Sequence, residues 1–191
     1  MKKTLLSMAI AATCALGFSA QAMTRAEYSA EKDRIGADYK AAKAKCDPMS
    51  GNAKDVCKAE AEGMEKTAKA DLEARYKPSA SHDRKAREAK ADADYKVAKE
   101  KCDDLSGNAK DVCVKDAKAA HTAAKADAKV AKTAADVRAG DASPAKMADA
   151  RKDAAEDKRD AEYKAAKERC DAMSGDSKDA CVKDVQAKYG K

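Results

Sequence analysis

The chain has 191 residues, of which 40 are Lys or Arg and 34 are Asp or Glu, and its formal net charge is +6. Leu, Ile, Val and Phe number only eleven after residue 22, which excludes a large hydrophobic core. Basic and acidic residues alternate without a run of five or six like charges, so the composition also argues against a nucleic-acid-binding arm.

Residues 1–22 have the pattern of a secretory signal peptide. An uncleaved membrane anchor is the alternative, but the apolar stretch is short for a membrane span. We expect the mature chain to begin at Met23, to have lost Cys14, to reside in the periplasm and to contain no later membrane-spanning segment. The three parts of the signal are Lys2-Lys3, the apolar stretch Thr4–Phe18 and the cleavage site Ala20-Gln21-Ala22.

One sequence pattern occurs three times in the rest of the chain. In each copy a Tyr lies seven residues before a Cys, and a second Cys follows eleven residues after the first, beyond a Ser-Gly pair. Such strict spacing predicts a repeated structural unit. The copies contain Tyr39, Cys46 and Cys57, then Tyr95, Cys102 and Cys113, then Tyr163, Cys170 and Cys181.

Start and stop signals predict six helices in chain order. The first begins at the capping box Thr24-Arg-Ala-Glu27 and ends before Pro48 and Gly51, which resist helix continuation. Ser143-Pro144 is a favoured start for the fifth helix. The other expected capping residues are Asn52, Ser81, Asn108 and Asp176, and the expected helices are 24–46, 52–77, 81–102, 108–138, 144–170 and 176–189.

The helices pair across short turns, so we predict an all-α fold of three consecutive antiparallel hairpins with coiled-coil-like seams. The hairpins are expected over 23–77, 82–138 and 144–189. Alanine dominates the expected seams, and small side chains bury little area. The seam of the first hairpin is expected to contain Tyr39, Ala42 and Cys46 opposite Cys57, Ala61, Met64 and Ala68, and that of the second to contain Cys113, Ala117, Ala120 and Ala124.

The chain has seven cysteines, and six remain once Cys14 is removed. An even number of cysteines in an exported protein favours disulfides over catalytic or metal-binding thiols. Each pair flanks one turn, which predicts the bridges Cys46–Cys57, Cys102–Cys113 and Cys170–Cys181. A redox-active or metal-binding dithiol is the alternative, but the chain has no Cys-x-x-Cys.

Other site chemistries fit the sequence poorly. The Ser-Gly turns fail as calcium loops because Cys46 occupies the first ligand position. Met49 and Met173 with His82 and His121 are too sparse a set to close a copper site. No nucleophile elbow, phosphate loop or zinc-protease motif occurs. We therefore expect no catalytic, cofactor-binding or metal-binding residues, and no cofactor.

The segments Tyr-Lys-x-Ala-Lys-x-Lys-Cys-Asp and Ser-Gly-Asn-Ala-Lys-Asp-Val-Cys behind a signal peptide resemble a group of exported Ala/Lys-rich repeat proteins of proteobacteria, often labelled TolA-like cell-envelope proteins. The resemblance implies a non-enzymatic periplasmic protein with a structural or interaction role, and it transfers no functional residue. Its partner would be an envelope protein or surface, or a second copy, and not nucleic acid. A periplasmic binding module for metal ions or polyanionic surfaces is the alternative.

Overall fold

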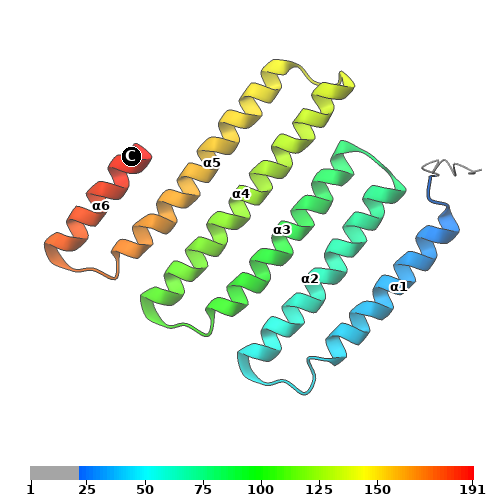
Figure 1. Ribbon diagram of the computed structural model, residues 1–191, viewed down its shortest axis with the longest axis horizontal. Helices are drawn as coiled ribbons and strands as arrows, with labels where there is room; N and C mark the ends of the chain where they lie inside the picture. Colours follow the sequence, from blue (N-terminus) through cyan, green and yellow to red (C-terminus); the bar gives the residue numbers. More distant parts are fainter. Residues whose placement is uncertain (1–21) are drawn as a thin grey trace, which may run out of the picture.

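The computed structural model describes residues 22–191, which form six α-helices joined by short turns (Figure 1). The predicted signal peptide, apart from its last residue, lies outside the described residues, as does Cys14. The helices are α1 (Arg25–Ala44), α2 (Gly51–Tyr76), α3 (Ala80–Cys102), α4 (Gly107–Ala139), α5 (Pro144–Cys170) and α6 (Gly175–Tyr189).

The six helices lie side by side in one layer and alternate in direction (Figure 1). Within residues 22–191, each helix packs only against the helices that precede and follow it in the chain. The fold is therefore all-α and contains the three predicted antiparallel hairpins. The hairpins also pack against one another, through α2 with α3 and through α4 with α5. Both broad faces of the layer are left without a covering helix from the described part of the chain.

A disulfide closes the turn of each hairpin, which confirms the predicted pairing. The Cα atoms are 5.6 Å apart in Cys46–Cys57 and Cys102–Cys113 and 5.7 Å apart in Cys170–Cys181. The first cysteine of each pair is 0% exposed. A lysine closes each turn a second time: Lys54 donates to the carbonyl oxygen of Asp47 at 3.2 Å, Lys110 pairs with Asp103 at 3.0 Å, and Lys178 pairs with Asp171 at 2.7 Å.

The starts of the helices agree with the sequence only in part. The capping box at Thr24 and the Ser143 cap are present. Ser81 is not a cap, because Ser79 accepts the hydrogen bond from the backbone N–H of His82. Asn52, Asn108 and Asp176 are not caps either, because each is already the second residue of its helix. The N-cap residues there are Ser50, Ser106 and Ser174, each followed by a glycine whose φ of 54 to 57° suits only a residue without a Cβ.

Inner helices bury small residues on two opposite sides, because they pack against a neighbour on each side. In α2, Ala59 is 1% exposed and Ala61 is 2% exposed, although a two-residue step turns them about 200° apart around the helix. In α4, Ala126 and Ala128 repeat this arrangement. The buried surface therefore consists of narrow lines between neighbouring helices and not of one interior.

Helices α2 and α3 approach each other closely at a glycine. A Cβ atom built on Gly63 would lie 2.9 Å from the Cβ atom of Ala93. Real Cβ atoms do not approach each other so closely, so Gly63 allows the two backbones to come together here.

Three residues predicted for the seams lie on a face of the layer instead. Met64 is 59% exposed, and Ala120 and Ala124 are exposed too. The prediction is wrong at these positions because it allowed each helix only one seam. An inner helix packs against two neighbours, so its buried residues form two lines around the helix, and these lines do not include the three predicted positions. The buried positions on the same helices include Leu72 and Ala128.

Among the described residues, no helix is both long enough and apolar enough to cross a membrane.

Candidate functional site

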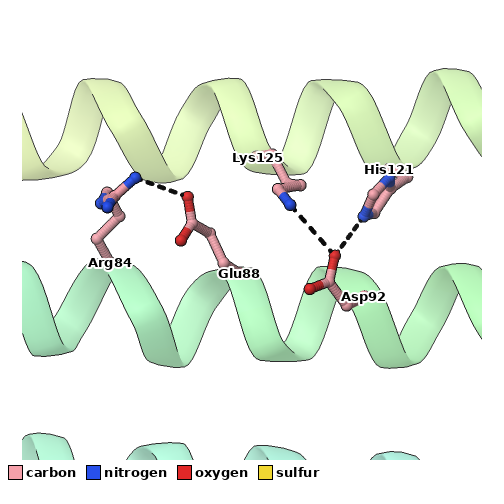
Figure 2. A network of polar contacts seen from close by, with 5 residues as sticks. All are labelled: Arg84, Glu88, Asp92, His121 and Lys125. Carbon is pink, nitrogen blue, oxygen red and sulfur yellow. Dashed lines mark hydrogen bonds and ion pairs between the residues drawn. The ribbon is translucent and has the colours of Figure 1, made fainter.

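A polar network joins α3 to α4 near the middle of the layer (Figure 2). Nε2 of His121 lies 2.5 Å from Oδ1 of Asp92, and Nζ of Lys125 donates to the same oxygen at 3.4 Å. The ring of Tyr95 stacks on that of His121, with 4.8 Å between ring centroids. The side chain of His121 is only 11% exposed, so the network is part of the seam between the two helices.

The carboxyl of Asp92 is held in its charged form by this network. Burial raises its pKa, but the hydrogen bond with His121 and the charge of Lys125 outweigh burial and leave the pKa below its ordinary value. A His–Asp pair also occurs in nucleophilic catalysis, where the histidine must reach a nucleophile. Here the ring of Tyr95 lies against His121, so the geometry favours a contact between helices over a catalytic pair.

The same stretch of α3 carries a second ion pair. Nη1 of Arg84 donates to Glu88 at 2.9 Å, and the two side chains extend from α3 toward α4 beside the Asp92 cluster (Figure 2). Nε of Arg84 is buried and has no hydrogen-bond partner among the described residues. This ion pair lies within α3 and places charged groups along a seam whose apolar residues are mostly alanine.

An open groove runs along α2 on one face of the layer, with α1 and α3 at its sides. Its volume is about 1040 Å³, and its apolar lining includes Ile35, Tyr39, Met64 and Ala68. A second hollow of about 720 Å³ between α2 and α3 shares Met64 and Ala68 with it, so the two are continuous.

The charged side chains of the groove balance. Its lining includes five acidic and five basic residues, so the groove has no net formal charge. Arg34 donates a hydrogen bond to Glu31 at 2.6 Å and, with a smaller contribution from Arg75, holds the pKa of that carboxyl below its ordinary value. A groove with an apolar lining and balanced charge suits a partner of mixed charge better than a polyanion.

The structure keeps the residues considered for metal binding apart. Met49 and Met173 lie in different turns and are 42% and 47% exposed. His82 lies in the first turn of α3, where Nδ1 is 2.8 Å from Oγ of Ser79, and His121 lies in the seam with α4. Within residues 22–191, no group of three or more His, Cys, Asp or Glu side chains is placed to hold a metal ion.

The sequence analysis missed the groove and the contact between Asp92 and His121. A signal for the second existed in the repeat. His121 and Tyr189 each lie eight residues after the second cysteine of their repeat, and both contact the repeated tyrosine of the opposite helix. The equivalent residue of the first repeat is Glu65. An aromatic pair across the hairpin could therefore have been predicted for the second and third repeats and not for the first.

Comparison of the chain with protein-family models, with curated proteins and with solved structures found no match.

Proposed function

We propose that this chain is a non-enzymatic helical repeat protein of the bacterial periplasm with a structural or interaction role in the cell envelope. A relationship to the exported Ala/Lys-rich Cys-repeat proteins is part of the same proposal. The observation that carries it is the single layer of helices, which exposes a large area for its chain length and has a groove of about 1040 Å³ on one face. Such extended surfaces are typical of repeat proteins that bind partners.

The proposed location has support from the cysteines. Three disulfides are compatible with an extracellular or periplasmic protein, since thiols stay reduced in the cytosol. Export through a cleavable signal peptide at residues 1–22 is a proposal that rests on the sequence.

Site-specific photo-crosslinking in cells tests the interaction role. A photoreactive amino acid at Met64, in the middle of the groove, should capture one recurrent envelope partner in the periplasmic fraction. The matched control is the same substitution at Lys69, which is exposed on the same helix but lies about 140° around it and does not line the groove. Mass spectrometry of the isolated protein would also determine its first residue.

Two outcomes would contradict the proposal. The protein could fractionate with the cytosol with its cysteines reduced, or Met64 and Lys69 could capture the same background proteins. Stoichiometric copper or zinc in the purified protein, or salt-reversible binding to a polyanion, would favour the alternative of a binding module for metal ions or polyanionic surfaces.

A further inference from the structure

The two seams between hairpins use the same ion pair. In the seam between α2 and α3, Nζ of Lys101 lies 3.2 Å from Oε1 of Glu60. In the seam between α4 and α5, Nη2 of Arg169 lies 2.5 Å from Oδ1 of Asp116. In both, the base is the residue before the first cysteine of one repeat, and the acid is the third residue after the second cysteine of the preceding repeat. The first and second repeats are thus each linked to the following repeat by an ion pair between the same two positions.

An amide at the start of the returning helix accompanies this ion pair. Nδ2 of Asn108 donates to the carbonyl oxygen of Glu168 at 3.0 Å, across the seam from α4 to α5. Asn52 holds the same position in the first repeat, but its buried Nδ2 has no hydrogen-bond partner among the described residues. The amide contact between repeats is therefore made by Asn108 alone.

The outer side of α6 carries the same surface that α2 and α4 use. Asp184 holds the position of Glu60 and Asp116, and Ala187 holds the position of Ala119, the α4 residue equivalent to Gly63 of α2. Both residues are exposed, and Asp184 makes no ion pair with another described residue.

The outer side of α1 carries the complementary surface. Lys45 holds the position of Lys101 and Arg169, and Ala37 holds that of Ala161, the α5 residue equivalent to Ala93 of α3. Both are exposed, and Lys45 makes no ion pair among the described residues. The two ends of the layer therefore carry the two halves of the seam that joins the hairpins inside it.

We propose that a second copy of this chain docks its α1 against α6, head to tail, as α5 docks against α4. Lys45 of one copy then pairs with Asp184 of the other. The two surfaces differ, so the contact is heterologous and can extend beyond two copies into a row. This goes beyond the proposed function, because a chain that stays monomeric could fill the same role in the envelope.

Two features make this contact weaker than the internal seams. α6 has 15 residues, so it offers only about four helical turns, whereas α2 and α4 have 26 and 33 residues. Asp176 stands where the other repeats have Asn52 and Asn108. A carboxylate cannot donate to the carbonyl oxygen of Ala44, the position equivalent to Glu168, and repels it instead. The exposed end of the layer thus associates reversibly.

Charge reversal in the full mature protein tests the geometry by sedimentation velocity over a range of concentrations. The natural chain should form dimers and longer species as its concentration rises. Lys45→Asp alone and Asp184→Lys alone should each stay monomeric, and an equimolar mixture of the two variants should associate again. The control Asp179→Lys changes an exposed aspartate on α6 whose counterpart Asp111 makes no ion pair, and it should associate as the natural chain does.

Asp176→Asn supplies the missing amide and should tighten the association by about tenfold, the effect of one recovered hydrogen bond at a polar interface. Two results would overturn the proposal. One is that both the natural chain and Asp176→Asn remain monomeric. The other is that association survives both single charge reversals, since it would then use another surface. Neither result bears on the location of the protein or on its capture of an envelope partner at Met64.

Discussion

Alanine lines the seams within a hairpin and the seams between neighbouring hairpins alike. Different contacts hold the two kinds of seam together. Within the second hairpin, the Cys102–Cys113 disulfide closes the turn, and Tyr95 stacks on His121 about two turns further along. Between the first and second hairpins, the contacts are the approach of Gly63 to Ala93 and the ion pair of Lys101 with Glu60.

This difference indicates how a chain with so few large apolar residues maintains a folded structure. A disulfide restricts the unfolded chain whatever the neighbouring side chains are, so a hairpin tolerates a weak seam. A seam between hairpins has no covalent link and depends on side chains that match in register. Lys96 and Glu62 illustrate this across α2 and α3, since their mutual hydrogen bond raises the pKa of Lys96 and lowers that of Glu62. The stability of each hairpin therefore depends mainly on its disulfide, whereas the packing of one hairpin on the next depends on side-chain contacts across the seam.

Removal of one disulfide should have the largest effect. Replacing Cys102 and Cys113 together by Ser should lower the free energy of unfolding of the second hairpin by about 3 kcal/mol, because the unfolded loop is no longer closed. Helix content followed by circular dichroism in urea measures this. Reduction of the natural protein is the control and should destabilise at least as much. Unchanged unfolding would mean that the alanine lines alone hold the hairpin.

A methyl group added where α2 and α3 approach each other closely should have the second-largest effect on stability. Gly63→Ala should destabilise by about 1–2 kcal/mol, because crowding against Ala93 exceeds the gain in helix propensity. Ala93→Gly in the same chain should restore most of the loss. Gly36→Ala is the matched control: a Cβ there meets nothing within 4 Å, so that variant should be more stable by about 0.5–1 kcal/mol. Equal behaviour of the two glycines would refute the close approach.

Loss of the amide between repeats should have a smaller effect. Asn108→Ala should cost about 1 kcal/mol, because the carbonyl oxygen of Glu168 loses its donor across the seam. Asp176→Ala removes the equivalent side chain from α6, which among the described residues packs only against α5, and should cost only about 0.3 kcal/mol, from the lost charge at the helix start. Urea unfolding at a low protein concentration, where chains do not associate, makes the comparison. A similar loss in both variants would assign the Asn108 effect to its own helix.

Much of this fold could be predicted from the sequence, because its strongest signals are local. The spacing of Cys46 and Cys57 specifies a closed turn, and Ser143-Pro144 specifies a helix start. Contacts between hairpins could not be predicted in the same way. Asn108 has the residue type of a helix cap, and only its hydrogen bond to the carbonyl oxygen of Glu168 in α5 reveals its other role. Met64 has the residue type of a core position, and only the second seam of α2 turns it outward to line the groove.

The polar contact within the second hairpin should have the smallest effect, and one that depends on pH. Asp92→Asn removes the charge that faces His121 and Lys125, and should cost about 0.5–1 kcal/mol at neutral pH, since Asp92 is 57% exposed and solvent screens it. The folded pKa of Asp92 lies below its ordinary value, so its contribution is complete above the unfolded pKa of about 3.9 and is lost as the pH falls through the folded pKa. The difference between the two proteins should therefore be present above about pH 5 and should vanish in stronger acid. Urea unfolding at a series of pH values measures it.

Lys90→Ala is the control, because it breaks an ion pair with Asp94 in which both side chains are 65% exposed, and its effect should stay within about 0.5 kcal/mol. An Asp92→Asn variant that is more stable than the natural protein at neutral pH would show that the carboxyl destabilises the seam, and the network would then have to be retained for something other than stability.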